Sequence, residues 1–321
     1  MTSGPSRSEP EPFETIDALV CGRGIAPRAV SDRARACQEA LGARDPLSRT
    51  IASRLLDRPG ARVALYTGFV VSEAYPAGEN DGPLGAAALA RALSRSRMKP
   101  TLFVDPEVTQ TTRWLLGEIG TDAPVIALDG ALHSLARPPD VAIAIEKPGI
   151  NPAGVLHTFD GARIERGSRP IDHLFVEFAR AGTLTVGIGD LGNEIGFGRL
   201  REQLLEMDPR MRTCTCGCGC GVAAATETDL LYPSVVSNWG AYGLAAGIAL
   251  LSGNPACALE AVEERRMLLV AAVRGCRDGV RRRGVYGVDG FGGELSVRVV
   301  RKLRRLVAHT LERSEEEDAC A

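Results

Sequence analysis

Short apolar runs rich in β-branched residues recur along the chain. Because both faces of such a run are apolar, each predicts a strand buried inside a sheet. The predicted strands are residues 62–66, 101–104, 125–128, 141–145 and 183–188. Stretches with helical spacing predict helices at residues 29–41, 46–56, 84–97, 194–207, 241–251, 256–274 and 295–311. The alternation predicts an α/β fold, with helices covering a mostly parallel sheet as an α/β/α sandwich.

The segments at the two ends differ from the rest of the chain. Residues 1–12 are rich in Pro, Ser and Glu, and residues 314–321 form a short acidic tail, so we expect both to be disordered. Residues 13–313 contain no long linker and no internal repeat, which predicts a single α/β domain.

Charge and hydropathy exclude several kinds of partner. With 38 basic and 40 acidic residues the net charge is −2, which gives no bulk attraction to nucleic acid or to an anionic membrane. The apolar runs are shorter than the roughly 18 residues of a membrane span. The N-terminal segment lacks the apolar region of a secretory signal, so we expect a cytoplasmic protein. The sequence leaves self-association open.

A glycine-flanked turn, GENDGPLG, follows the first predicted strand and leads into a predicted helix. Ligands of parallel sheets bind beyond the carboxyl ends of the strands, where such turns lie. Glu79 and Asp81 place two carboxylates in this turn, where they could hold a divalent cation. Alternatively, Asn80 or Asp81 is only the N-cap of the helix that follows.

A second turn, GIGDLGNEIGFG at residues 187–198, follows the last predicted strand. Its glycines would let a ligand approach the backbone, and Asp190, Asn193 and Glu194 supply polar groups. The turn contains a literal G-x-G-x-x-G. Its carboxylates, however, would stand where a pyrophosphate needs free N–H groups, so we expect no nucleotide cofactor. The alternative interpretation makes Asn193 a helix N-cap with Glu194 in the first turn.

With these turns the chain resembles the D-glutamate cyclase family, specifically its C-terminal domain, which also occurs alone in bacterial proteins. The motifs that carry the resemblance are YTGF (66–69), ENDGPLGA (79–86), IEKPGINPAGVLHTFDGARI (145–164), GIGDLGNEIGFG (187–198) and VSNWGAYGLA (236–245). The sequence departs from the family at Leu191, where glycine is usual, and at Asn80, where threonine is usual. Larger members carry an additional N-terminal domain.

The resemblance implies a hydro-lyase that converts D-glutamate to 5-oxo-D-proline and water. The amine must lose a proton before it attacks, and the γ-carboxylate must be neutralised before an oxygen can leave. Asp190 and Glu194 are the expected proton-transfer groups. An acidic pocket repels a dicarboxylate, so we expect a bound Mg²⁺ or Mn²⁺. The expected metal ligands are Glu79, Asp81, Glu146 and Asp190.

Some of these residues have a structural alternative. Glu146 could instead form an ion pair with Lys147 or mark an exposed strand end. The expected substrate-binding residues are Thr67, Gly68, Asn193, Asn238 and Arg199. Thr67 and Gly68 could also form an ordinary strand-ending turn, and Asn238 could cap the helix that follows it.

Four cysteines stand at alternate positions in the segment CTCGCGC, residues 214–220. The spacing differs from the C-x₂-C pair of a zinc knuckle, and in an extended chain the thiols would share one face. Reduced loop thiols are the expectation, with soft-metal binding or oxidation as alternatives. The resemblance assigns them no role, and no histidine pair has a metal-binding spacing; we expect His157 to be structural.

Two other functions are compatible with the same residues. A carboxylate-held Mg²⁺ or Mn²⁺ would also serve a metal-dependent phosphatase or another hydrolase. A metabolite-binding protein without catalytic activity would use the same pocket. The expected ligand in the preferred interpretation is a small anionic amino acid.

Overall fold

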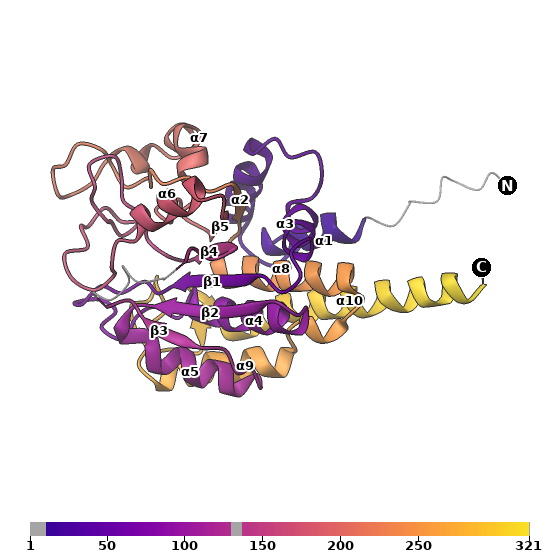
Figure 1. Ribbon diagram of the computed structural model, residues 1–321. Coiled ribbons are helices and arrows are strands. Elements are labelled where there is room, and N and C mark those ends of the chain that lie inside the picture. Colours follow the sequence, from indigo (N-terminus) through magenta and orange to yellow (C-terminus); the bar gives the residue numbers. More distant parts are fainter. Residues whose placement is uncertain (1–10, 130–136, 321) are drawn as a thin grey trace.

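The computed structural model describes residues 11–129 and 137–320 and centres on a six-stranded sheet (Figure 1). Neighbouring strands are all parallel, in the order β3-β2-β1-β4-β5-β6. The strands are β1 (Arg62–Thr67), β2 (Lys99–Val104), β3 (Val125–Ala127), β4 (Val141–Ile145), β5 (Leu184–Gly189) and β6 (Leu230–Pro233). The sequence pattern predicts five of them. It does not predict β6, a short edge strand whose final proline is tolerated only at such an edge.

Helices cover both faces of the sheet, which confirms the α/β fold (Figure 1). One face packs against α4 (Pro83–Arg95) and α8 (Ser237–Ser252), and the other packs against α6 (Asp172–Arg180). Around α4 and α8 lie α1 (Pro12–Val20), α3 (Leu47–Leu56), α5 (Thr109–Glu118), α9 (Ala261–Val273) and α10 (Gly293–Cys320). Two more helices, α2 (Arg28–Ala40) and α7 (Arg201–Met207), contact each other near β6.

Small elements complete the chain. They are the 3₁₀ turns η1 (Pro106–Val108), η3 (Gly198–Leu200), η4 (Pro209–Arg212) and η5 (Pro255–Cys257), and the hairpin strands β7 (Gly287–Val288) and β8 (Phe291–Gly292). None of the helices within the described residues combines the length and the apolar character needed to cross a membrane. The cellular compartment stays a prediction.

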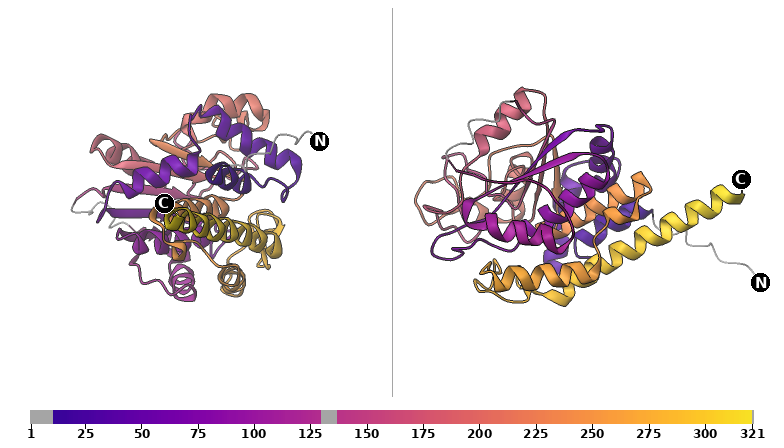
Figure 2. Two further views of the ribbon diagram at one scale, coloured as in Figure 1. Left: turned by 90° about the vertical axis from the view of Figure 1, so that its right-hand side faces the viewer. Right: turned by 60° about the horizontal axis from the view of Figure 1, so that its bottom comes forward.

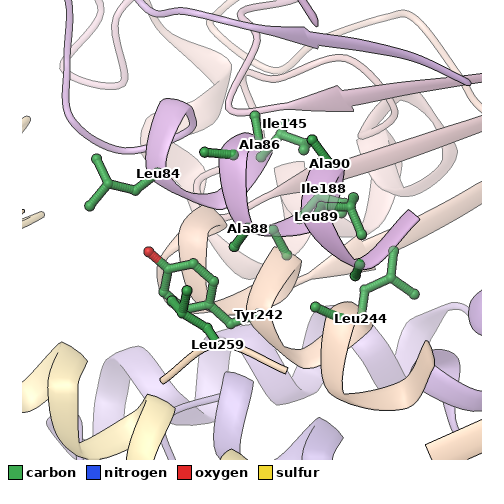
Figure 3. Packing of buried hydrophobic residues seen from close by; sticks show 14 of the residues in the cluster. Leu84, Ala86, Ala88, Leu89, Ala90, Ile145, Ile188, Tyr242, Leu244 and Leu259 are labelled. Carbon is green, nitrogen blue, oxygen red and sulfur yellow. The ribbon is translucent and has the colours of Figure 1, made fainter. Parts of the chain in front are cut away.

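Helices α4 and α8 pack closely because small residues line their contact (Figure 3). A Cβ placed on Gly85 would lie 2.9 Å from the Cβ of Ala241, so a larger side chain there would push the helices apart. Ala86, Ala90 and other small residues of α4 are fully buried in the same core. This close approach brings the N-terminus of α8 directly beside the N-terminus of α4.

The opposite face of the sheet holds a smaller aromatic core. Tyr66 of β1 stacks on Phe103 of β2 at a centroid distance of 5.1 Å, and Phe175 of α6 meets Tyr66 edge-on at 5.5 Å. Side chains alternate along β1, with Leu65 facing α4 and Tyr66 facing α6. Burial on both faces explains why the strands read as continuous apolar runs.

Two of the predicted segments differ from the structure. The helix predicted from residue 194 begins only at η3. The backbone N–H groups of Ile195 and Gly196 donate to the carbonyl oxygens of Lys147 and Thr226, so these residues bond to neighbouring segments instead of forming a helical turn. Helix α10 continues to Cys320, where a disordered tail is predicted, since its glutamate-rich end contains no glycine or proline to stop it. Figure 2 shows this end projecting beyond the rest of the fold. The other predicted disordered segment lies largely outside the described residues.

The strand order reverses between β1 and β4, where the chain crosses from one half of the sheet to the other. Parallel sheets leave a crevice at this switch point, beyond the carboxyl ends of the two strands. Thr67 ends β1, Glu146 follows β4, and Asp190 follows β5. The fold therefore collects the ends of three central strands at one edge of the sheet.

Candidate functional site

A cavity of about 190 Å³ opens at this edge of the sheet. Its lining acids are Glu79, Glu146, Asp160, Asp190 and Asp289, and its other side chains include Phe69, Tyr75, Phe159, Asn193 and Arg282. Among the described lining residues, Arg282 carries the only positive charge. The cavity is therefore strongly acidic and small, with aromatic side chains among its walls.

Asp190 lies at the centre of the acidic groups. Its side chain is 5% exposed, and its Oδ1 atom has no hydrogen-bond partner in the protein. One oxygen each of Asp190, Asp81 and Asp289 lie within 4.8 Å of one another, and the same holds for Asp190, Glu146 and Glu194. Asp190 thus belongs to two groups of three carboxylates, either of which could hold a cation.

Asp289 is an acid of the site that the sequence prediction misses. It lies in the turn between β7 and β8, where Asp289 has φ 47° and Gly290 has φ 77°. Positive φ at both central residues is the type I′ hairpin turn, for which Asp-Gly is a favoured pair. The Asp289 carboxyl lies within hydrogen-bonding reach of the carboxyls of Glu79, Asp81 and Asp190. The dipeptide Asp289-Gly290 is therefore a local sequence signal for this hairpin.

Backbone strain concentrates around the cavity. The structure gives positive φ angles to four described non-glycine residues, and three of them, Glu146 (46°), Arg282 (54°) and Asp289 (47°), line the cavity. This conformation is unfavourable for residues with a Cβ and persists where the surroundings enforce it, often at functional sites. Ser237 donates a hydrogen bond to the buried Glu146 carboxylate, so Glu146 is neither exposed nor paired with Lys147.

Asp81, which directly precedes the start of α4, caps α8, and Asn238 of α8 caps the start of α4. Asp81 accepts the backbone N–H groups of Ser237 (2.8 Å) and Asn238 (2.7 Å) at the start of α8. The Asn238 Oδ1 accepts the N–H groups of Gly82 (2.9 Å) and Gly85 (2.7 Å) at the start of α4. The capping alternative is therefore wrong as stated, because the N-caps of α4 and α8 are Gly82 and Val236 and the two side chains serve the opposite helices. A substrate contact for Asn238 stays a prediction.

Burial and mutual repulsion make the carboxyls of the site hard to ionise together. Burial raises the pKa of Asp190 well above its usual range, and the nearby Glu146 and Asp289 raise it further. The pKa values of Glu79, Asp81 and Glu146 are raised in the same way, by burial first and then by neighbouring acids. Without a cation, the cluster would have to retain protons near neutral pH.

The glycines of GIGDLGNEIGFG make room for the loop itself, which corrects the expectation that they open space for a ligand. A Cβ on Gly187 would lie 2.6 Å from the carbonyl oxygen of Ile195. Glu194 faces the same loop, where its carboxylate accepts the N–H groups of Gly192 (2.7 Å) and Leu191 (3.1 Å). The residue is fully buried and is absent from the cavity lining, whereas Asn193 lines the cavity with its Oδ1 unpaired.

Arg199 lies away from the site, contrary to the prediction. It donates to the carbonyl oxygens of Thr228 and Asp229, at 3.2 and 2.8 Å, just before β6. Asp229 in turn bonds to Thr185 at the beginning of β5, so Arg199 stands at the amino edge of the sheet. Arg199 directly follows the glycine turn in the sequence, but this closeness does not predict where its side chain lies, because the loop folds back along β5.

The predicted substrate-binding residues Thr67 and Gly68, and the nearby Lys147, are absent from the cavity lining. Lys147 is fully buried and donates to Asp105 at 2.5 Å and to the carbonyl oxygen of Gly68 at 3.4 Å. The Thr67 hydroxyl is buried without a hydrogen-bond partner, 2.5 Å from where a Cβ on Gly82 would stand. Substrate contacts for Thr67 and Gly68 stay predictions.

Two comparisons relate the chain to known proteins. The human protein named "D-glutamate cyclase, mitochondrial" is 28% identical over 209 residues, which make up 59% of this chain and 33% of that protein. The chain thus spans about a third of the length of this relative. The family described as D-glutamate cyclase-like, C-terminal, matches residues 17–304, nearly the whole described fold, and the chain belongs to this family.

Proposed function

We propose that the protein converts D-glutamate to 5-oxo-D-proline and water, with a divalent cation, Mg²⁺ or Mn²⁺, held in the acidic cavity. The observation that carries the proposal is the buried, unpaired Oδ1 of Asp190 within two groups of carboxylates. A buried acceptor without a partner costs about 1–3 kcal/mol, which a cation or a substrate proton would recover. Family membership supports the choice of D-glutamate.

The donor set fits such a cation. Mg²⁺ and Mn²⁺ prefer carboxylate oxygens, and Asp190 would hold the ion with Asp81 and Asp289, while Glu146 approaches Asp190 in the second group. A bound divalent cation would neutralise the γ-carboxylate of the substrate and polarise its carbonyl. Glu79 also lines the cavity but belongs to neither group of carboxylates, so we assign it to supporting Asp289 and not to the ion.

The remaining side chains of the cavity suit an amino acid with two carboxylates. Arg282 bonds to Asp160 and can turn to the α-carboxylate of the substrate. The unpaired Oδ1 of Asn193 can accept a hydrogen bond from the ammonium group. The γ-carboxyl would then lie beside Asp190, folded toward the amine, and holding these two groups together supplies part of the rate.

Asp190 is the residue to which we assign the proton transfers. It takes a proton from the substrate ammonium, and the free amine then attacks the carbon of the γ-carboxyl group to form the C–N bond. One C–O bond breaks, and the departing oxygen receives two protons that began on the nitrogen, so it leaves as water. Asp190 ends in its starting protonation state. Glu194, whose carboxylate is held by two backbone N–H groups, orients the loop that carries Asp190.

Asp190→Asn tests the reaction. We expect the wild-type protein with Mn²⁺ to form 5-oxo-D-proline from D-glutamate, measured by chiral chromatography, and the variant to be at least about 100-fold slower. The variant should unfold at the same or a higher temperature, since it removes one buried charge. Turnover of phosphate esters would favour the hydrolase alternative. Thermal stabilisation by D-glutamate without product would favour a binding protein.

Arg282→Gln tests how the substrate is held. Because Arg282 is partly exposed, we expect its loss to raise KM for D-glutamate by roughly 10-fold while kcat changes little. Arg283→Gln is the matched control, since Arg283 is an exposed neighbour outside the cavity lining. Equal KM values for the two variants would show that Arg282 does not bind the substrate.

A further inference from the structure

The cysteine segment is a curled loop that gathers three thiols around a histidine. Gly217 and Gly219 both have φ 75°, so the segment turns instead of running extended as the alternating pattern suggests. The Cys214 Sγ lies 3.5 Å from that of Cys216 and 3.4 Å from that of Cys218. The His157 Nε2 lies 3.2 Å from the Cys216 Sγ. All four atoms fall within 4.8 Å of one another.

Protein contacts hold this loop in place on two sides. Thr215 donates its backbone N–H to the carbonyl oxygen of Gly161 at 2.9 Å, next to the short bridge between His157 and Arg163. Asn151 donates to the carbonyl oxygen of Gly221 at 2.7 Å and to the Cys218 Sγ at 3.2 Å. Two separate segments of the chain therefore bring the three thiols and the imidazole together, as is common in protein metal sites.

We propose that Cys214, Cys216, Cys218 and His157 bind a structural Zn²⁺ ion. Three cysteines and one histidine form a known tetrahedral zinc set, in which two sulfur ligands lie about 3.8 Å apart. The observed separations of 3.4 and 3.5 Å need little adjustment to reach that geometry. They exceed the roughly 2.05 Å of a disulfide, and these cysteines are free thiols.

The chemistry of the ligands suits this role, because zinc binds cysteine sulfur and histidine nitrogen. Cys220 is part of the sequence repeat but not of this cluster, which makes it an internal control.

The zinc ion would brace one wall of the acidic cavity. The carbonyl oxygen of His157 accepts a hydrogen bond from the Asn193 amide at 3.0 Å. Phe159 and Asp160, which follow His157 closely, line the cavity. Fixing His157 to the cysteine loop would therefore fix the position of this wall. The zinc proposal itself does not depend on the reaction proposed above.

Cobalt substitution tests the site in the full-length protein. Reduced, metal-free protein titrated with Co²⁺ should develop a sulfur-to-cobalt charge-transfer band and the intense visible bands of tetrahedral coordination, saturating at about one ion per chain. Added Zn²⁺ should displace the Co²⁺ and abolish both the charge-transfer band and the visible bands. Cys216→Ser should weaken the band and Cys220→Ser should not. Asp190→Asn should leave it unchanged, which separates this site from the cation of the acidic cavity.

A second measurement needs no variant. With Zn²⁺ bound, alkylation followed by mass spectrometry should show Cys214, Cys216 and Cys218 protected and Cys220 modified, and a chelator should expose all four. An octahedral cobalt spectrum without a thiolate band, or equal alkylation of the four cysteines with and without Zn²⁺, would overturn the proposal.

Discussion

The carboxyl of Asp289 is where the acids of the cavity meet. It lies within hydrogen-bonding reach of acids from the β1–α4 turn and the β5 loop, and Asp278 fixes its hairpin by accepting the N–H of Gly290 at 2.9 Å. Such a cluster of buried carboxyls is stable only if protons or a cation balance its charge. The state of these few residues therefore controls both the stability and the proposed chemistry of the site.

Asp289→Asn should change how stability depends on pH. Burial raises the folded pKa values of the cluster above the ordinary 3.8 and 4.5, so its contribution to stability is complete below about pH 4 and is lost as pH rises through the raised values. In chelator, the free energy of unfolding in urea should fall less steeply from pH 5 to 8 in the variant. Mn²⁺ should flatten the wild-type profile. Parallel profiles for the two proteins in chelator would refute this.

Residue-level prediction succeeds where the signal is local. Asp190 and Asn193 stand in a turn after a strand and do line the cavity. Asp289 contacts acids roughly 100 to 210 residues away in the sequence, so the local Asp-Gly signal predicts its turn but not its partners. Arg282, not Arg199, is the arginine of the cavity, because only the tertiary fold decides which arginine faces inward.

At the scale of elements, the paired starts of α4 and α8 position the site. Asn238 of α8 caps α4, Asp81 just before α4 caps α8, and Glu146 also contacts the first residues of α8. The sequence suggests a cap at each helix but not the exchange between them. The caps are exchanged because α4 and α8 pack closely through Gly85 and Ala241, which brings the two N-termini together.

Asn238→Ala should remove the cap of α4. The buried N–H of Gly85 loses its acceptor and that of Gly82 keeps only the Asp81 Oδ1 at 3.0 Å, so we expect the free energy of unfolding to fall by about 2 kcal/mol. Asn254→Ala is the matched control, because Asn254 accepts only the N–H of Ala256 at an exposed turn, and its loss should cost under about 1 kcal/mol. Urea unfolding would compare them, and similar losses would argue against the exchanged cap.

Gly187→Ala should show that the glycine loop is packed against β5. The added Cβ would clash with the Ile195 carbonyl oxygen and the Gly196 Cα, so we expect a loss of about 3 kcal/mol. Gly117→Ala, in α5 with open space around its Cβ, should instead stabilise the protein by about 0.5 kcal/mol. If both variants matched the wild type in thermal unfolding, the close packing of this loop would be wrong.

At the scale of the whole molecule, burial decides what the sequence predicts well. The strands β1, β4 and β5 are buried on both faces and are readily predicted, and their carboxyl ends define the site. The short hairpin β7–β8 and the course of residues 194–197 depend on contacts with distant segments. Family resemblance predicts the chemistry of the acidic turns, whereas the cysteine–histidine cluster emerges only from the fold.

In the proposed reaction, the acidic cavity closes D-glutamate into a ring with the help of a divalent cation. The most direct measurement is the rate of 5-oxo-D-proline formation as Mn²⁺ is added to chelator-treated protein. We predict no product without the ion, a rate that rises to saturation with Mn²⁺, and no such rise in Asp190→Asn. A rate that is independent of Mn²⁺, or no product at any concentration, would contradict this proposal.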